Sequence, residues 1–440
     1  MLEVLEECPV LGWAASGGMA LTGFADDVPV ASPAAGFGLL GLVVRQLAEA
    51  TRATGLEVRA DPGEILAGRA ALAGFSRRGR ISAGGAARLL RAADGWCAVN
   101  LSRADDVAAV PAILGVLGRD AALGGGGAGT GGTDVVWEAL AAAAVGTTAA
   151  ALAAAAQLLG VPAAALPPRP ASMSGPSGLA GRVSRIAARS PGARLAGAVV
   201  ADLSSLWAGP LCARLLGLAG AQVIKVESAD RPDGARAGDL RFFDWLHAGH
   251  RSVVVDFRSE SGRAALAALI ATADVVIEAS RPRALAALGL APGTCPHRDG
   301  QVWLSITGHG RAAGDLVAFG DDAAVAGGLV GWAGDEPVFC ADAIADPLTG
   351  LCGALAVARS VAAGGGELID LPMRAVAAAF AAAPEVGHGP HPVGAGGRTV
   401  RCARLGREQP VLPPARPVPD GAAVERGADT EAVLAWLTAC

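Results

Sequence analysis

Residues 197–290 alternate between short apolar runs and segments in which apolar positions recur with helical spacing. Buried strands are predicted for the runs AGAVVADLS, QVIKVE, SVVVDF and DVVIEA, and helices for AGPLCARLLGLAGA and SGRAALAALIATA. Strands that alternate with helices predict an α/β fold with a doubly wound parallel sheet. Ligands of such sheets bind outside the carboxyl ends of the strands, so binding groups are expected in the loops after Leu203, Glu227, Phe257 and Ala279.

A second pattern is an internal repeat that relates residues 21–36 to residues 329–350. Both copies contain a Leu, a Gly, an Asp, a Pro-Val pair and a final Gly in the same order, and the second copy carries six extra residues. Both continue into a helical pattern, a strand-like piece (LEVRAD or ELIDLP) and an Ala-rich helix. Asp346 of ADPLTG then matches Ser32 of ASPAAG. This order predicts a duplication or a fusion.

Other segments have less regular patterns. Residues 75–118 predict a basic turn, a short helix and a strand after Asp94-Gly95-Trp96. Residues 119–134 are Gly-rich and predict a flexible loop, and residues 166–194 are Pro-rich and predict a linker. The uncharged segment Ala139–Leu166 consists mostly of Ala, which is only marginally apolar, so a buried or half-buried helix is favoured over a membrane span.

Composition and charge exclude some classes of function. The 440 residues predict two or three domains, and a net charge of −5 does not provide the basic surface of a nucleic-acid-binding protein. The eight cysteines, from Cys8 to Cys440, contain no CxxC pair, which argues against a zinc site and indicates a reducing, cytoplasmic location. The N-terminus does not resemble a signal peptide. His388 and His391 have no acidic neighbours in sequence, so no metal site is expected.

Four segments, in the right order, resemble class III CoA-transferases, the family of formyl-CoA and carnitine CoA-transferases. They begin VVADLSSLWAGP, HAGHRSVVVDF, WLSITGHGRAAG and ADPLTGLCGALAV, and the resemblance is nearly continuous over residues 197–380. Residues 13–72 resemble another aspartate segment of this family, and residues 85–115 resemble the start of its smaller domain. The chain therefore resembles two truncated family members fused. The resemblance implies a Rossmann-like large domain with a doubly wound parallel sheet and a smaller α+β domain.

The order of segments predicts six units. They are a degenerate first aspartate segment (1–74), a small domain (75–165), a linker (166–194), a Rossmann-like CoA-binding part (195–290), a second aspartate segment (291–385) and a C-terminal return (386–440).

The resemblance implies that the chain moves CoA between two carboxylic acids, through an aspartyl acyl-anhydride and an aspartyl-CoA thioester. Acyl-CoA and a carboxylic acid would be its substrates, with no tightly bound cofactor, no nucleic acid and no membrane, and a homodimer would be its assembly. Asp346 matches the family's catalytic aspartate. From the residues alone, Asp346 before Pro347 also suits a helix N-cap, where the helix dipole favours an ionised carboxyl by about 0.3–1 kcal/mol. Ser32 would cap equally well, but a hydroxyl cannot form the anhydride, so the first copy is expected to be catalytically silent.

The resemblance also assigns residues to CoA, from the first strand-end loop to the loop that faces the thioester. These are Trp207 and Ala208, then Val255 and Arg258 near the adenine, Ser280 and Arg281 at the phosphates, and Phe319 and Gly320 at the thioester end. Two departures weaken the match. Ala287 stands where several members have a phosphate-binding Arg, which Arg283 could replace, and Ser228 stands where one branch has Arg.

Two alternatives stay open at this point. The related 2-methylacyl-CoA racemases pair the same Asp with a His just upstream, but residues 315–330 contain no His and His309 lies too far upstream. A non-catalytic CoA-binding scaffold subunit is the other alternative, because the segment order is unusual and Ser32 and Ala287 depart from the family pattern.

Overall fold

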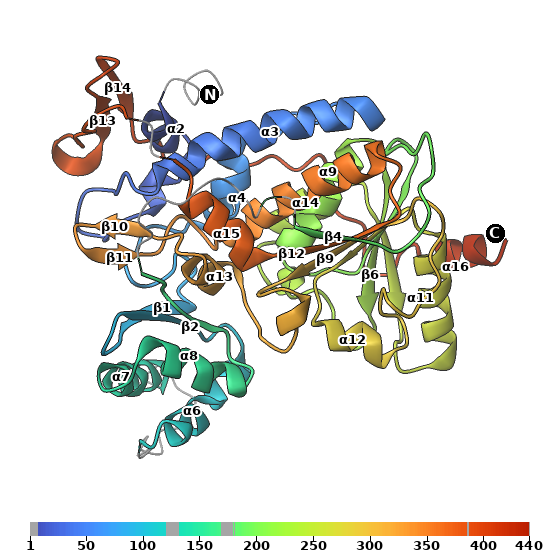
Figure 1. Cartoon of the computed structure of the whole chain (residues 1–440), viewed down its shortest axis with the longest axis horizontal. Helices are drawn as coiled ribbons and strands as arrows, with labels where there is room; N and C mark the ends of the chain where they lie inside the picture. The colour runs from blue at the N-terminus through green and yellow to red at the C-terminus, as the bar shows by residue number, and fades with distance from the viewer. Residues whose placement is uncertain (1–7, 120–131, 169–178, 180, 385–386, 440) are drawn as a thin grey trace.

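The computed structural model describes residues 8–119, 132–168, 179, 181–384 and 387–439, and its centre is a seven-stranded sheet (Figure 1). The strands, in spatial order, are β4 (Arg182–Arg185), β12 (Glu367–Pro372), β9 (Val302–Thr307), β8 (Val275–Glu278), β5 (Val199–Asp202), β6 (Gln222–Ser228) and β7 (Arg251–Val255). All neighbours pair in parallel except β4, which is antiparallel to β12. The predicted parallel sheet is confirmed.

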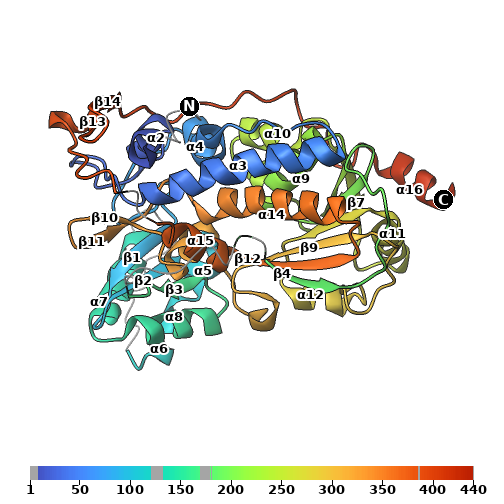
Figure 2. The same cartoon turned by 45° about the horizontal axis from the view of Figure 1, so that its top comes forward.

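Helices cover both faces of this sheet (Figure 2). One face carries α9 (Ala208–Leu218) and α14 (Ala345–Ala362), and the other carries α11 (Glu260–Thr272), α12 (Pro282–Ala287) and the C-terminal α16 (Thr430–Ala439). Side chains that alternate along a strand enter different cores: Val200 packs with α9, and Ala201 packs with α11. Burial on both faces explains why the central strands β5 (VVAD) and β8 (VVIE) consist mainly of apolar residues.

The strand order predicts the point of the sheet at which a ligand would bind. Numbered along the chain, the parallel strands have the order 3-2-1-4-5-6 of dinucleotide-binding folds, which reverses between β5 and β8. In folds of this kind the loops after these two strands diverge, and ligands bind in the crevice that forms between them. Two of the four predicted binding loops, residues 203–207 and 279–281, begin there.

A smaller α+β lobe follows the N-terminal segment in the chain (Figure 1). Its strands β1 (Ala87–Arg91), β2 (Trp96–Asn100) and β3 (Ala163–Ala165) form an antiparallel sheet, covered by α5 (Ala104–Ala108), α6 (Val110–Val116), α7 (Gly132–Val145) and α8 (Ala149–Leu158). The lobe contacts the rest of the chain through α13 (Gly320–Ala326), which packs on β2 and β3.

Two predictions for this lobe were wrong. The expected short helix before Asp94 is strand β1, because the turn at 92–95 folds it back against β2. The uncharged Ala-rich segment forms two helices, not one, since the chain turns at 146–148 and Thr148 caps α8. Among the described residues, no helix is long and apolar enough to cross a membrane.

The N-terminal segment packs on the large domain through its long helix. Helix α2 (Pro9–Ala15) precedes α3 (Ala34–Thr54) and α4 (Pro62–Ala73), and α3 lies beside α14 (Figure 2). The two predicted aspartate segments share an arrangement of two helices joined by an extended piece. In the first segment the helices are α3 and α4, and in the second they are α14 and α15 (Met373–Ala381). The predicted strand LEVRAD is wrong, because this piece has no neighbouring strand, whereas ELIDLP forms β12 beside β9.

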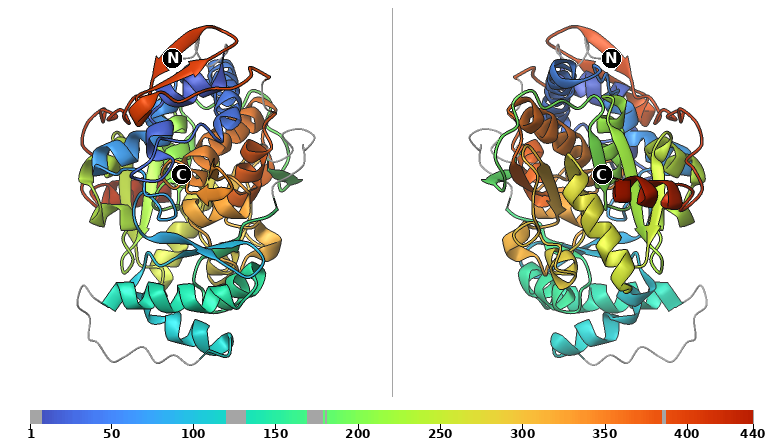
Figure 3. Two further views of the ribbon diagram at one scale, coloured as in Figure 1. Left: turned by 90° about the vertical axis from the view of Figure 1, so that its left-hand side faces the viewer. Right: turned by 90° about the vertical axis from the view of Figure 1, so that its right-hand side faces the viewer.

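One further helix and two β-hairpins lie outside the two main sheets (Figure 3). Helix α10 (Leu240–His247) follows β6, and two hairpins are formed by β10 (Gly331–Ala333) with β11 (Glu336–Val338) and by β13 (Thr399–Cys402) with β14 (Arg407–Pro410). Part of the predicted linker is strand β4, which is a correction. The Gly-rich run at 120–131 lies outside the described residues. The predicted domain boundaries and the fusion of two family members stay predictions.

Candidate active site

Asp346 lies in the first turn of α14, not at its N-cap. The helix begins at Ala345, Ile344 occupies the N-cap position, and no side chain caps the helix. The residues just before it adopt left-handed backbone, with φ of 52° at Ala341 and 40° at Ala343. Such conformations cost about 1–3 kcal/mol each and persist where the surroundings hold them. The predicted capping role of Asp346 was therefore wrong, and the carboxyl group is free for other contacts.

Ser32 also differs from the prediction. Helix α3 begins at Ala34 with Pro33 as its N-cap residue, so the Ser32 hydroxyl does not cap it. Ser32 instead lines a cavity of about 690 Å³ between α3, the end of α15 and the loop that holds His388. Capping therefore explains neither member of the matched pair.

The guanidinium of Arg69 lies among three acidic groups, Asp321, Asp342 and Asp346. Arg69 of α4 makes a two-pronged ion pair with the buried Asp342, with N–O distances of 2.6 and 2.8 Å. Its charge also acts on Asp321 and Asp346. Asp321, in the first turn of α13, accepts a hydrogen bond of 3.1 Å from the Ala343 backbone N–H. Segments far apart in the chain thus meet at one charged cluster.

Burial changes the acidity of two members of this cluster. It raises the pKa of Asp346 to about 7 against the opposing charge of Arg69, and Asp321 and Asp342 raise it further. It also raises the pKa of Asp321 to about 7, with Asp342 acting in the same direction. Burial alone would lower the pKa of Arg69, but Asp342 outweighs it and the pKa is raised. Carboxyls with such raised pKa values are typical of functional sites.

Gly320 brings backbone into contact with the Asp346 carboxyl. A Cβ at this position would lie 2.4 Å from Asp346 Oδ2 and 2.2 Å from the Ala343 carbonyl oxygen, so no other side chain fits without movement. The Gly320 backbone N–H is a hydrogen-bond donor to Asp346 and lowers its pKa. The predicted place of Gly320 at the thioester end of CoA stays a prediction. Phe319 precedes it, and the Arg103 guanidinium lies 5.6 Å from its ring centre.

Positive charge gathers near the predicted phosphate site. Burial and the charges of Arg283, Arg103 and Arg231 lower the pKa of Arg281. Arg281 and Arg283 lie at the start of α12, Arg103 lies at the start of α5, and Arg231 lies in the loop after β6. Arg281 and Ser280 follow β8 at the point where the strand order reverses. Arg283 also pairs with the exposed Asp315 at 3.2 Å.

The residues predicted near the adenine lie at the neighbouring strand end. Val255 is the buried last residue of β7. Arg258 is exposed and forms an ion pair of 2.6 Å with Asp230, next to Arg231 in the chain. Its predicted contact with adenine stays a prediction.

Trp207 and Ala208 connect the crevice to the charged cluster. Trp207 is buried, and the Arg69 guanidinium lies 4.9 Å from its ring centre, in the range of a cation–π contact. Ala208 begins α9, and its carbonyl oxygen packs closely against Gly350 of α14, which is possible because Gly350 has no side chain. The loop after β5 is thus fixed against both Arg69 and the helix that carries Asp346.

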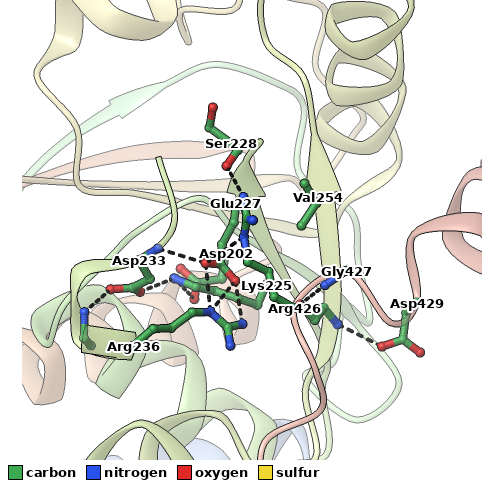
Figure 4. Close-up of polar contacts among 12 residues, drawn as sticks. Asp202, Lys225, Glu227, Ser228, Asp233, Arg236, Val254, Arg426, Gly427 and Asp429 are labelled. Carbon is green, nitrogen blue, oxygen red and sulfur yellow. Dashed lines mark hydrogen bonds and ion pairs between the residues drawn. The ribbon is translucent and has the colours of Figure 1, made fainter. Parts of the chain in front are cut away.

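A buried ionic network holds this loop in place (Figure 4). Lys225 of β6, the chain's one lysine, is 2% exposed and donates to the Ser204 carbonyl oxygen and, at 2.8 Å, to Asp233. Asp233 accepts from the backbone N–H of Leu206, which has a left-handed φ of 72°. The Lys225 ammonium also lies 3.8 Å from the Asp202 carboxylate. The network therefore sets the backbone that presents Trp207.

The matching family model is "CoA-transferase family III", over residues 195–419, just over half of the chain. This chain belongs to CoA-transferase family III. A succinate–glutarate CoA-transferase of Agrobacterium fabrum is 30% identical over 211 residues, which cover 43% of this chain and 53% of that protein. A probable CoA-transferase of Mycobacterium tuberculosis is 41% identical over 95 residues, 20% of this chain and 12% of that protein.

Solved structures give a likeness over a similar part of the chain. A CaiB/BaiF family protein from Brucella suis is 29% identical, covers 43% of this chain and 55% of its own, and has a TM-score of 0.38. The chain matches about half or less of the length of each of these relatives.

Four groups that the sequence analysis did not single out stand out in this site of the family III chain: Arg69, Asp321, Asp342 and Lys225. Arg69 and Asp342 lie 273 positions apart, and Arg69 occurs in an Ala-rich helix without a recognisable motif. Lys225 had one usable signal, because a lone lysine within an apolar strand is unusual in an Arg-biased chain.

Replacing Lys225 tests the buried network. Lys225→Met would leave Asp202 and Asp233 buried without their cation, which costs about 3–5 kcal/mol of unfolding free energy. Urea unfolding measures this loss. The control Arg52→Met removes the exposed pair with Glu57, which solvent screens, so only a small loss of stability is expected. Equal small losses in both variants would contradict the assigned role.

Replacing Asp346 tests the acidity of the cluster. Its native pKa lies above its unfolded value, so the wild type loses stability as pH rises from about 4 through about 7. Asp346→Asn cannot ionise, so its free energy of unfolding, measured in urea, is expected to exceed that of the wild type at about pH 8 by about 1 kcal/mol or more. The difference should vanish near pH 4. Asp335→Asn, at an exposed turn, should show no such pH dependence.

Proposed function

We propose that the chain is a CoA-transferase that moves CoA between carboxylic acids, with Asp346 as the nucleophile. The observation that supports this most directly is the Asp346 carboxyl itself. It is enclosed by Arg69, Asp321 and Asp342 and lies against the backbone of Gly320. A carboxylate with few competing waters and a nearby N–H donor has what attack on a thioester carbonyl needs.

The steps balance without any further reactant. The Asp346 carboxylate attacks the thioester carbonyl, the C–S bond breaks, and CoA thiolate leaves an aspartyl acyl-anhydride. The thiolate attacks the aspartyl carbonyl of the anhydride, which releases the first acid and forms an aspartyl-CoA thioester. The second carboxylate displaces the thiolate to form a new anhydride. Attack of the thiolate on the new acyl carbonyl then yields the product thioester and restores Asp346.

The charged cluster would support the first step by keeping part of the Asp346 carboxyl ionised, and so nucleophilic, near neutral pH. With pKa values of about 7, Asp346 and Asp321 both titrate near neutral pH. Arg69 favours the ionised state of Asp346, and a protonated Asp321 would remove like-charge repulsion. The Gly320 N–H, which donates to the Asp346 carboxyl, would stabilise the negative charge that develops on an Asp346 oxygen when the thiolate attacks the aspartyl carbonyl.

CoA would lie between the arginine cluster and Asp346. The phosphates suit Arg281, Arg283 and Arg231 at the crevice, because guanidinium groups bind phosphate through paired hydrogen bonds. Arg103 lies between this cluster and Phe319, beside Gly320. Within the described chain this gives an order from a basic end to the half-buried carboxyl group of Asp346, which suits a phosphate-bearing thioester.

Neither alternative has a specific observation in its favour. The charges that act most strongly on Asp346 are those of Arg69, Asp321 and Asp342, and His309 is not among them. The racemase alternative would need such a His. The scaffold alternative predicts CoA binding without covalent modification, so the trapping experiment below separates it from the transferase.

Trapping of the covalent intermediate is the deciding test. Purified protein is incubated with succinyl-CoA, glutaryl-CoA and acetyl-CoA, then with hydroxylamine, and modified peptides are found by mass spectrometry. We expect a hydroxamate at Asp346, because hydroxylamine attacks both the anhydride and the thioester.

Matched variants make the trap specific. Asp346→Ala should abolish the adduct, whereas Ser32→Ala and the exposed-site variant Asp335→Ala should keep it. CoA binding with no adduct from any of the three thioesters would reject the transferase proposal in favour of the scaffold.

Arg281 gives a separate test of the CoA position. Arg281→Gln is expected to weaken CoA binding about tenfold, or about 1.4 kcal/mol, through the loss of a phosphate contact. Calorimetric titration measures this, and pantetheine, which lacks the phosphates, should bind both proteins equally. Arg298→Gln is the control, because Arg298 binds the Thr272 carbonyl oxygen before β8, at the opposite end of the strand. Unchanged CoA affinity in Arg281→Gln would remove this residue from the site.

A further inference from the structure

Two cysteines and two histidines meet at one point away from the candidate active site. They are Cys8, just before α2, His388 and His391, in the loop after α15, and Cys402, the last residue of β13. One potential ligand atom from each residue lies within 4.8 Å of the others. These residues come from both ends of the chain, so their meeting is a product of the fold and not of local spacing.

The distances suit one tetrahedral ion. Cys8 Sγ lies 3.1 Å from His391 Nε2, and Cys402 Sγ lies 3.7 Å from His388 Nδ1. With Zn–S bonds of about 2.3 Å and Zn–N bonds of about 2.0 Å, tetrahedral geometry requires sulfur–nitrogen separations of about 3.5 Å. The two observed separations lie on either side of that value. A small rotation of the imidazole rings would satisfy both.

Burial and donor chemistry favour zinc over harder ions. Cys8 and Cys402 are fully buried, His388 is 7% exposed and His391 is half-buried. The set holds no oxygen ligand, which disfavours Mg²⁺ and Ca²⁺, whereas two thiolates and two imidazoles match structural zinc sites. Two thiolates also neutralise the charge of the ion, so a buried site would carry no net charge. Both cysteines are free thiols in the structure.

The surrounding structure gives the ion a role and a path of entry. The β13–β14 hairpin buries mainly Val400 and Cys402, and a lone two-stranded hairpin is marginally stable in water. It packs on α2, so an ion would tie the hairpin, the loop after α15 and the N-terminal helix together (Figure 1). The cavity of about 690 Å³ that contains Ser32 is also lined by Cys8, His388 and His391, and it provides access.

We propose that Cys8, His388, His391 and Cys402 bind one Zn²⁺ in a closed, four-coordinate structural site. With four protein ligands the ion has no open position, so its role is to anchor the hairpin and not to take part in group transfer. Binding releases the two thiol protons as the thiolates form. The proposal replaces the expectation of no metal site, and it does not depend on the proposed CoA-transferase activity.

Metal analysis of the full-length protein tests the site directly. The protein is purified under reducing conditions without metal-affinity chromatography, and zinc is measured by inductively coupled plasma mass spectrometry. We expect about one Zn²⁺ per chain, and the Cys8→Ser, Cys402→Ser double variant should lose it. Cys295→Ser is the matched control, because Cys295 also has a nearby histidine, His297 at 4.0 Å, but lies outside the cluster. It should keep its zinc.

X-ray absorption on the wild type keeps the test decisive if the double variant fails to fold. A shell of two sulfurs at about 2.3 Å and two nitrogens at about 2.0 Å would support the proposal. The proposal is overturned by an oxygen-dominated shell, by zinc retained in the double variant, or by protein that stays metal-free after incubation with Zn²⁺ under reducing conditions. A Cys8–Cys402 disulfide in protein isolated without reductant, with no zinc bound after reduction, would overturn it as well.

Discussion

The candidate site depends on one charged contact, the ion pair between Arg69 and Asp342. It places a half-buried guanidinium among three carboxyl groups, and without that cation Asp321, Asp342 and Asp346 would face one another where charge is weakly screened. Because Arg69 belongs to α4 and the acids belong to α13 and the start of α14, this contact also holds the N-terminal segment against the large domain.

Other polar contacts hold the strand-end loops in a fixed arrangement. Lys225 and Asp233 set the loop after β5, and Arg311 bridges Glu278, at the end of β8, and Ser305, within β9. The loops of a doubly wound sheet have few apolar contacts of their own, so their positions depend on such hydrogen bonds. The crevice at the β5–β8 reversal is therefore bordered by loops that are already in place, which lowers the cost of ordering them around a ligand.

The two aspartate-like segments have different roles in the folded chain. The second supplies Asp346, Asp342 and the backbone turn between them, whereas the first supplies Arg69 from its last helix. Ser32, the residue that matches Asp346, faces a separate cavity beside the proposed zinc ligands. Within the described residues, the first segment thus supports the site of the second and has a different environment at its own matched position.

The apolar periodicity of the sequence was enough to predict the parallel strands, the helices between them and the loops where a ligand would bind, because buried strands and helices leave a regular local pattern. The ordered family motifs likewise singled out Asp346. Local pattern failed for AARLLR, which became a strand only because β2 lies beside it, and for LEVRAD, which found no strand to join. The Arg69 contact and the Cys–His cluster have no sequence signature, since each joins residues hundreds of positions apart. Such contacts are decided by packing in three dimensions, where the burial of each group depends on neighbours that the order of residues does not show.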